Sequence, residues 1–453
     1  MTTALGGMLA YVLVQFLIGA WVSRRISSES DYILAGRRLG PGLTMFSVFA
    51  TYFGAEAIVA SGGAVYDKGL SGAVVDPIAY AGAIVLVGLC FARALWNRGL
   101  TTFADLFRER YSPGVERLVV IVLLPGSVIW AAAQVRAFGQ VMDANSGMGL
   151  KTGIVLAAVL VTMYAIIGGL LADAVTDLIQ GVAVLVGLLI LGSIVAAQVG
   201  GVAAGLDRVP PAQLEFFDTT EGVLGTIEKL AVPICGTIVA VELISRFLGA
   251  RSAEVARSAT AVGGIVYLLI GMVPVFLGLV GPNLLPKVHD SEQTVARLAE
   301  IYLPGVLYVA FVGAIISAIL STVHSALHAP ASQISHNIVV RIIPGLSSSG
   351  KLWAVRGTVM VLCMVAFTIA ITAAGIHEIV ETASAFGSAG VFVATLFALF
   401  TRYGGPLSAY LSIMAGLIFW AAGKYLFAMG TPYLLGLTAA ASGYVAGAFL
   451  QRD

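Results

Sequence analysis

The chain has little charge and little cysteine for its length. Only 11% of its 453 residues are Asp, Glu, Lys or Arg, whereas about a quarter of a soluble domain is charged. The three cysteines, Cys90, Cys235 and Cys363, have no CxxC spacing, so we expect small buried side chains rather than a disulfide framework or a zinc site. The sequence has no nucleophile–base pair or metal-binding motif, which argues against an enzyme. No nucleic-acid partner and no obligate protein partner is expected.

Apolar residues are abundant where charged residues are few. They make up 59% of the chain, and the mean hydropathy is +0.97. A run of about 20 apolar residues can cross a hydrocarbon core as a helix, which satisfies its own backbone polar groups. We therefore expect an all-α polytopic membrane protein in a lipid bilayer, with about 13 transmembrane helices. The predicted spans are 4–23, 41–66, 72–97, 115–145, 150–172, 175–198, 221–246, 259–282, 302–333, 353–374, 380–401, 405–426 and 431–450.

Basic residues are concentrated in alternate linkers between these spans. If the N-terminus is outside, most of the 25 Lys and Arg residues fall on the inner side, among them Arg24, Arg25 and Arg246. Cytoplasmic linkers of membrane proteins carry an excess of Lys and Arg. The sequence therefore predicts an inner or plasma membrane protein with its N-terminus outside and its C-terminus in the cytoplasm.

Two spans contain helix breakers at matching places. Gly54 and then "SGG" at 61–63 interrupt the span 41–66, and Pro233 and Gly236 interrupt the span 221–246. Each of these spans opens a block of five, 41–198 and 221–401, within a single membrane domain, 1–453. Interrupted helices at corresponding positions of two halves indicate a transporter with inverted repeats, whose ligands bind beside the breaks.

A face of small and hydroxyl side chains marks the span 302–333. Its members recur at spacings of three and four: Ala314, Ala318, Ser321, Thr322 and Ser325. Hydroxyl groups beside freed carbonyls suit a hard cation such as sodium, although the same spacing also serves helix packing. A carboxylate, Asp177, opens the span 175–198. It either favours the N-terminal end of that helix or faces an ion path.

Glu56 lies inside an apolar run, "YFGAEAIVASGG" at 52–63. A charge at the centre of a membrane helix costs about 2.5–3.5 kcal/mol, so such a residue is a candidate for function. Three roles stay open: contact with a donor or cationic group of a solute, proton coupling, and an ion pair with Arg136. Glu242 follows the second interrupted helix. Two acids and one Arg near one cavity favour a cationic or amine-bearing solute. Asp76, near the outer end of a span, is expected at the membrane interface.

Aromatic and histidine side chains complete the set of candidates. The rings that we expect to line the cavity are Tyr52, Tyr80 and Trp130. Aromatic faces attract quaternary ammonium groups, although packing or an interfacial position explains such rings as well. Three histidines recur at spacings of four and eight: His324, His328 and His336. They are expected as polar residues near the inner gate, with a role in sensing pH left open.

Four stretches, found in the same order, resemble the sodium:solute symporter family. They are "SDYILAGRRLGP" (30–41), "ATYFGA" (50–55), "GGLLADAVTDLIQ" (168–180) and "AILSTVHSA" (318–326). Two further stretches, "FARALWNRGLTTFADLFRERY" (91–111) and "VIWAAAQVRAFG" (128–139), are most similar to the branch that contains high-affinity choline transporters. The resemblance implies a leucine-transporter-type fold, in which two inverted five-helix repeats follow one extra helix, 4–23, and precede two more, 405–450.

The resemblance also implies particular site residues. It implies a sodium ion bound by the carbonyls of Ala50, Phe53 and Ala318 and by the hydroxyls of Ser321 and Thr322. Some members hold a second sodium with the acid of the "TD" motif; the corresponding residues here are Asp177, Ser325 and His324, beside Ser321. His324 stands where members usually carry Asp or Ser. Ala240 stands where the choline branch has Trp.

These observations predict a sodium-coupled secondary active symporter that imports a small organic solute by alternating access, with sodium as its only expected cofactor. A proton-coupled carrier, or a sugar or amino-acid carrier on the same scaffold, is the alternative among transporters. A membrane solute sensor with a transporter-like domain is the alternative from another class.

Overall fold

The described part of the chain is helical. The computed structural model describes residues 3–24, 26, 28–217, 222–285, 288, 290–343, 345–372 and 382–451. This part contains no β-strand beyond an isolated bridge between Leu39 and Ala250. Nine of its helices are long and apolar enough to cross a membrane, and shorter apolar helices cover Ala10–Ser23, Leu150–Met163 and Ser388–Phe400. An all-α polytopic membrane protein is therefore confirmed, whereas thirteen as the number of spans stays a prediction.

The helices of the N-terminal half follow the predicted spans closely. They are α1 (Thr3–Ser23), α2 (Glu29–Leu34), η1 (Ala35–Arg37), α3 (Pro41–Tyr52), η2 (Glu56–Ala60), α4 (Ser61–Lys68), η3 (Gly69–Ala73), η4 (Val74–Ala79), α5 (Tyr80–Leu86), η5 (Val87–Ala92), α6 (Arg93–Asn97), α7 (Ala104–Arg110), α8 (Pro113–Ser146), α9 (Leu150–Ile167), α10 (Leu170–Gln198), α11 (Val202–Leu206) and η6 (Pro211–Leu214).

The C-terminal half has the same character. Its helices are α12 (Gly222–Val239), α13 (Val241–Leu248), α14 (Ala253–Leu284), η7 (Ser291–Gln293), α15 (Thr294–Tyr302), α16 (Gly305–Gln333), η8 (Ile334–Val339), α17 (Val340–Ile342), α18 (Ser348–Thr372), α20 (Ser388–Phe400), α21 (Pro406–Ala421), η9 (Ala422–Leu426) and α22 (Pro432–Leu450). The predicted boundaries at 221, 374 and 380 lie outside the described residues.

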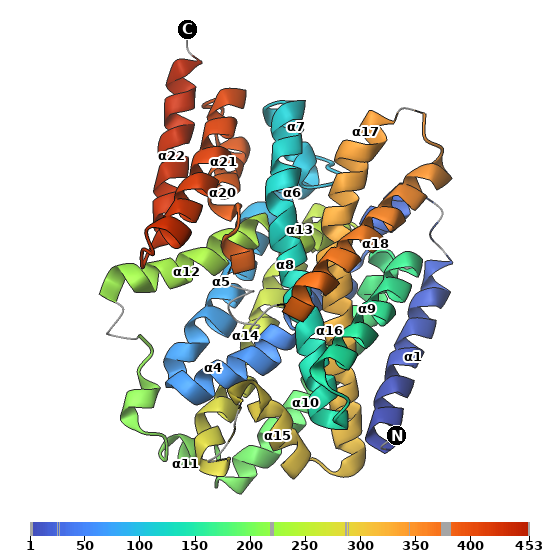
Figure 1. The fold of residues 1–453 in the computed structure, drawn as a ribbon, viewed down its shortest axis with the longest axis vertical. Helices are drawn as coiled ribbons and strands as arrows, with labels where there is room; N and C mark the ends of the chain where they lie inside the picture. Colours follow the sequence, from blue (N-terminus) through green and yellow to red (C-terminus); the bar gives the residue numbers. More distant parts are fainter. Residues whose placement is uncertain are drawn as a thin grey trace.

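The helices form one bundle around α3, α8 and α16. α16 packs against α8, α10 and α1, and α3 packs against α14 and α10. Figure 1 shows α20, α21 and α22 together along one side, with α1 at the opposite edge. The start of α1 and the end of α22 lie toward opposite ends of the longest axis in this view.

The first interrupted helix breaks at Gly54. α3 ends at Tyr52, and the Gly54 N–H donates to the Tyr52 carbonyl (2.9 Å) instead of continuing the helix to Ala50. A Cβ on Gly54 would lie 2.9 Å from the Thr322 hydroxyl oxygen, so the break needs glycine. The second interruption expected at 61–63 does not form. α4 runs through these residues, and Gly62 and Gly63 allow close approach of the segment 291–295.

The second interrupted helix breaks at Ala240 rather than at Pro233 or Gly236. α12 continues through both of these residues, and α13 begins after Ala240, whose ψ of 113° is extended. Gly236 serves packing instead, because a Cβ there would lie 2.9 Å from the Ser384 carbonyl oxygen. Proline removes one helical hydrogen bond without ending a helix that its neighbours hold in place.

The Glu228 side chain links the C-terminal helix α22 to the second interrupted helix. The Glu228 carboxylate of α12 accepts the Tyr433 N–H (2.6 Å) and the Leu434 N–H (2.8 Å) at the start of α22. A carboxylate is stabilising at a helix N-terminus, where unpaired N–H groups and the helix dipole meet it. The expected burial of the cysteines holds for Cys235 and Cys363, whereas Cys90 is exposed.

Candidate solute and cation sites

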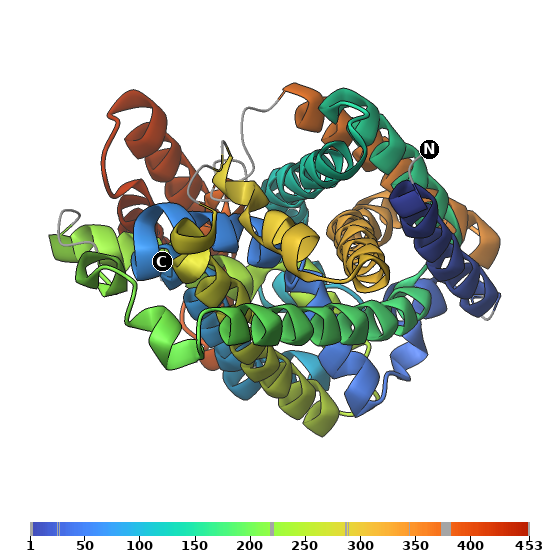
Figure 2. The ribbon, with the colours of Figure 1, turned by 90° about the horizontal axis from the view of Figure 1, so that it is seen from below.

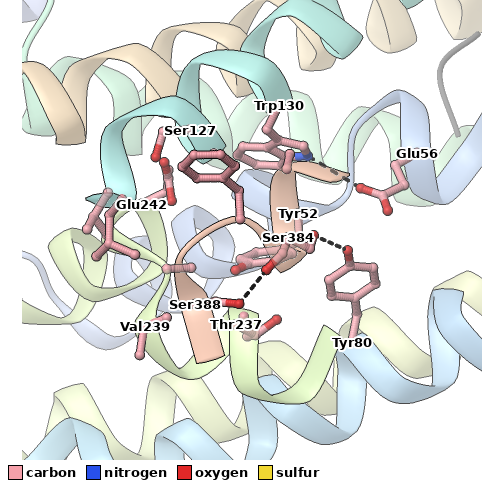
Figure 3. Close-up of a pocket in the computed structure, with 17 residues that line it drawn as sticks. Tyr52, Glu56, Tyr80, Ser127, Trp130, Thr237, Val239, Glu242, Ser384 and Ser388 are labelled. Carbon is pink, nitrogen blue, oxygen red and sulfur yellow. Dashed lines mark hydrogen bonds between the residues drawn. The ribbon is translucent and has the colours of Figure 1, made fainter. Parts of the chain in front are cut away.

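A cavity lies between the two breaks and is lined by residues of both interrupted helices. Its walls come from α3, η2, α5, α8, α12, α13 and the segment 383–388 (Figure 3). The space open to the centre of a water-sized sphere is about 70 Å³. One water needs about 10–15 Å³ on this measure, so the cavity has room for several waters or a small solute.

The three expected aromatic residues meet at this cavity. The ring of Tyr52 lies 5.8 Å from that of Tyr80 and 5.8 Å from that of Trp130, measured between centroids. The Tyr80 hydroxyl lies 3.0 Å from the Ser384 hydroxyl, and the Trp130 Nε1–H donates to Glu56 Oε2 at 3.4 Å (Figure 3). Tyr52, Tyr80 and Trp130 therefore form one aromatic wall with Glu56 at its edge.

Two carboxylates, Glu56 and Glu242, line the same cavity. Their exposed fractions are 9% and 5%. Glu242 lies next to Ser127 (Figure 3), and its Oε1 atom has no hydrogen-bond partner among the described residues. No Lys, Arg or His belongs to the described lining. The cavity is therefore acidic, with one carboxylate oxygen free to accept a hydrogen bond.

Arg136 does not line the cavity, and the ion pair with Glu56, one of the three roles left open, is absent among the described residues. The Arg136 Nη1–H donates to the Ala370 carbonyl of α18 at 3.3 Å. Trp130 and Arg136 are six residues apart on α8. At about 100° per residue this turns Arg136 by about 240° from the face of Trp130, away from the cavity.

Asp76 is buried inside the protein, and its expected position near the membrane interface stays a prediction. It is 5% exposed, and the Tyr267 hydroxyl donates to its Oδ1 atom at 2.9 Å. Asp76 belongs to η4, where its backbone leaves the helical conformation (φ −126°, ψ 121°), and this change turns the side chain toward α14.

The structure brings together three of the five residues expected to bind sodium. The Thr322 hydroxyl donates to the Ala318 carbonyl (2.9 Å) and approaches the Ala50 carbonyl at 3.3 Å. Phe53 is the residue at which α3 ends, with φ −82° and ψ 60°. Ser321 points elsewhere, because its hydroxyl donates to Asp177 Oδ1. The break thus places two backbone carbonyls of separate helices around one hydroxyl group.

Asp177 does not open its helix. α10 begins at Leu170, seven residues earlier, so Asp177 lies about two turns inside and is fully buried. Gly169 has extended backbone at the N-cap, which moves the boundary from the predicted 172–175 to 167–170. The Ser47 hydroxyl donates to Asp177 Oδ2 at 2.8 Å, in addition to the bond from Ser321.

Sequence reasoning missed a second acid, Asp173, and its partner Arg246. The distribution of basic residues predicts Arg246 on the inner aqueous side, but its side chain is 1% exposed and lies 2.5 Å from Asp173 Oδ2. It also donates to Thr51 at 2.9 Å and to Ser325. His324 Nδ1 lies 3.1 Å from Asp173 Oδ1. The available signal was the spacing of four between Asp173 and Asp177, which puts both acids on one helix face.

These residues form a single buried ionic cluster between α3, α10, α13 and α16. We call it the ionic cluster; its members are Ser47, Thr51, Asp173, Asp177, Arg246, Ser321, His324 and Ser325. Two carboxylates face one guanidinium, so the formal charge is −1 while His324 is neutral. Charges inside a membrane protein pair with one another or border an ion path.

The other two histidines lie farther along the same helix. The His328 Nε2 atom is 3.1 Å from the Tyr32 carbonyl oxygen, and its ring packs on Tyr32 with centroids 4.9 Å apart. The His336 Nδ1 atom is 2.9 Å from Glu29 Oε1. The histidines thus pair with separate groups.

Comparison with known proteins gives consistent results. The model of the sodium:solute symporter family matches residues 32–416. The high affinity choline transporter 1 of Homo sapiens is 25% identical over 457 residues, covering 94% of this chain and 77% of its own. The sodium/proline symporter of Escherichia coli is 25% identical over 381 residues, covering 80% and 75%.

Two solved structures share the fold. A sodium-coupled sialic acid symporter in a substrate-bound outward-open state superposes with a TM-score of 0.86 at 16% identity, covering 99% of this chain and 98% of its own. The transporter MhsT in complex with L-phenylalanine superposes with a TM-score of 0.59 at 13% identity, covering 91% and 98%. The fold is of the leucine-transporter type.

Proposed function

Because the chain belongs to the sodium:solute symporter family, we propose that it is a sodium-coupled symporter that imports a small cationic or amine-bearing solute by alternating access. The carrying observation is the cavity between the two breaks, where two buried carboxylates and three aromatic rings meet without a basic residue in the described lining. Its N-terminus would be outside the cell membrane and its C-terminus in the cytoplasm, as the distribution of basic residues predicts.

The chemistry of the cavity supports a cationic solute. A quaternary or protonated amine gains from the faces of Tyr52, Tyr80 and Trp130 and from the charge of Glu56 and Glu242. The unpartnered Glu242 Oε1 atom would accept a hydrogen bond from the solute. The choline transporters among the relatives fit this chemistry. Ala240, however, offers only a methyl group where the choline branch has the aromatic ring of a Trp.

An amino acid is the second candidate solute. Sodium/proline symporters are also among the relatives, at the same 25% identity. An amino acid carries an amine for the carboxylates, but its own carboxylate would need a donor. The hydroxyls of Ser127, Thr237 and Ser384 are the donors that line the cavity. No feature of the described cavity favours a sugar carrier or a solute sensor.

The oxygens around Thr322 support a sodium site. The proposed ligands are the carbonyls of Ala50, Phe53 and Ala318 and the Thr322 hydroxyl, with Ser321 joining after a rotation of its side chain. Carbonyl and hydroxyl oxygens are the ligands that hard cations prefer. An ion there would hold α3 to α16, next to Tyr52 in the solute cavity. Sodium would therefore raise the affinity for solute, and solute would raise the affinity for sodium by the same factor.

The ionic cluster supports a second monovalent cation. Its formal charge of −1 would be balanced by one ion bound to Asp177, Ser321 and Ser325, with His324 at the edge. Protonation of the cluster is the alternative that would make the carrier proton-coupled. The two blocks 41–198 and 221–401 are proposed as inverted repeats, because each begins with a helix that breaks beside the same cavity.

The test is thermal stability of the purified protein in sodium and in potassium, followed by uptake of solute candidates into vesicles. A ligand that binds only the folded state raises the melting temperature. We expect sodium, but not potassium, to stabilise the protein, and choline or proline to add a shift only in sodium. A solute that binds equally well without sodium would contradict the proposal. A shift with falling pH in place of sodium would favour the proton-coupled carrier.

A further inference from the structure

A second cavity lies away from the solute site, between α1 and the bundle. It is lined by residues of α1, α9, α10 and α16, and the space open to the centre of a water-sized sphere is about 270 Å³. Its walls are mainly apolar, with Val12, Leu13, Phe16, Leu160 and Met163 among them. Figures 1 and 2 both show α1 at the edge of the molecule, beside α9 and α16.

This cavity opens toward lipid. Leu13 and Met163 line it and are also 56% and 49% exposed. Both belong to helices apolar enough to lie in the membrane, so their exposed surface faces hydrocarbon. A molecule that reaches the cavity between α1 and α9 would come from the bilayer.

Two buried glutamines give the cavity a polar end. Gln15 on α1 and Gln180 on α10 are 4% and 3% exposed, and both line the cavity. Neither Oε1 atom accepts a hydrogen bond from the described residues, although the Tyr11 hydroxyl lies near the Gln15 side chain. A buried polar atom without a partner costs about 1–3 kcal/mol, and water is scarce at this depth. Two such acceptors beside one apolar cavity indicate a ligand-binding site.

We propose that this cavity is a binding site for an uncharged, lipid-soluble molecule with a hydroxyl group. The hydroxyl donates its proton to one of the two glutamine oxygens, and the apolar part fills the space toward Leu13 and Met163. A fatty carboxylate would be repelled by the glutamine oxygens and by the nearby acids of the ionic cluster. An ammonium group would pay a large desolvation cost on its way through hydrocarbon.

The cavity also adjoins the proposed cation sites. Ser321 lines the cavity and donates a hydrogen bond to Asp177. A ligand beside Ser321 would limit the rotation that brings its hydroxyl to a sodium ion. This consequence rests on the proposed function, whereas the binding site does not.

The site is tested by photolabelling the full chain in lipid nanodiscs with an octanol that carries a diazirine. Mass spectrometry should find the label on Leu13, Phe16, Leu160 or Met163. We expect octanol to displace the label, and octane to displace it about fivefold less well, which is the effect of one net hydrogen bond. Label elsewhere, or octane competing as well as octanol, would overturn the proposal.

Matched variants separate the hydrogen bonds from the apolar fit. In Gln15→Leu/Gln180→Leu, octanol should lose its advantage over octane. The variant should fold, because it removes two unpartnered acceptors, and its melting temperature should not fall. Gln198→Leu, at the exposed end of the same helix α10, should behave like the wild type. An octanol advantage that persists in the double variant would overturn the role of the glutamines.

A separate experiment measures whether the ligand changes sodium binding. Octanol should raise the sodium concentration for half-maximal thermal stabilisation at least twofold in the wild type and not in the double variant. Specific labelling without such a change would overturn the coupling and support the site. The absence of any sodium stabilisation, with labelling intact, would count against the proposed function and not against the site.

Discussion

At the scale of single residues, the deciding feature is how each buried charge finds a partner. Arg246 pairs with Asp173 and donates hydrogen bonds to Thr51 and Ser325, whereas Glu56 accepts a hydrogen bond from the Trp130 N–H at the cavity. The protein itself supplies partners for the Arg246 guanidinium. The Glu56 carboxylate can still accept hydrogen bonds from the cavity side, as a binding site for a cationic solute requires.

Glu242→Gln should weaken solute uptake without unfolding the protein. Hydrogen bonds to charged groups contribute about 1.5–3 kcal/mol, so KM for a cationic solute should rise about 10- to 100-fold. KM from initial uptake rates in vesicles measures this change. The control is Glu254→Gln, a 70% exposed side chain on α14. An unchanged KM in Glu242→Gln would remove this carboxylate from the solute site.

Arg246→Gln should destabilise the fold. It leaves Asp173 buried beside Asp177 without its guanidinium, and breaking a buried pair costs about 3–5 kcal/mol. The melting temperature should fall, and adding Asp173→Asn should restore part of the loss. Arg251→Gln, an exposed neighbour, is the control. If the double variant were less stable than Arg246→Gln, the pairing would not explain the burial of Arg246.

Glu29 gives a prediction for pH. The hydrogen bond from His336 holds the pKa of this carboxyl below its ordinary value of 4.5, against the opposing effect of burial. A depressed pKa in the folded state means that the stabilisation is present above pH 4.5 and is lost as pH falls through the folded value. Melting temperatures of wild type and Glu29→Gln should therefore differ near neutral pH and converge in acid. A constant difference would contradict this assignment.

At the scale of elements, sequence reasoning located one break and misplaced the other. Gly54 was correct, because only glycine fits against Thr322 and Gln134. Ala240 carries no local signal, since alanine favours helix. Its extended backbone is set by the packing of α12 and α13 against the rest of the bundle, which the sequence does not display. The same limit explains Arg136: which helix face meets the cavity depends on the rotation of α8.

Gly54→Ala tests the first break. The new Cβ would lie 2.9 Å from the Thr322 hydroxyl and 3.1 Å from Gln134 Oε1. We expect a loss of stability of about 1–3 kcal/mol from overpacking. We also expect the sodium-dependent thermal shift to disappear, because the carbonyls around Thr322 move apart. Gly82→Ala on α5, with no atom within 4 Å of the added Cβ, is the control. A sodium shift of normal size in Gly54→Ala would argue against the proposed ion site.

At the scale of the whole molecule, composition was sufficient to predict the class of protein. The resemblance was sufficient to predict the family. Low charge and long apolar runs determined a polytopic helical protein, and the four stretches quoted above named the family that the comparison later showed. The ionic cluster was only half found. Asp177, Ser325 and His324 were named, but Asp173 and Arg246 come from other helix positions whose meeting depends on the tertiary fold.

The orientation in the membrane is testable by labelling in intact cells. Ala212→Cys, exposed on η6 beside α11, should react with a membrane-impermeant maleimide added outside. Ser347→Cys, exposed before α18, should react only after the cells are permeabilised. The wild type, with its own Cys90, gives the background. The reverse pattern would place the N-terminus inside.

The Glu228 carboxylate ties the first turn of α22 to α12. We therefore expect a tilt of the second interrupted helix to move the first turn of α22 with it. A fluorophore attached near Leu450 would report that tilt in real time, far from both the solute cavity and the ion-binding oxygens. Glu228→Gln would loosen the linkage and reduce the signal while leaving both sites intact.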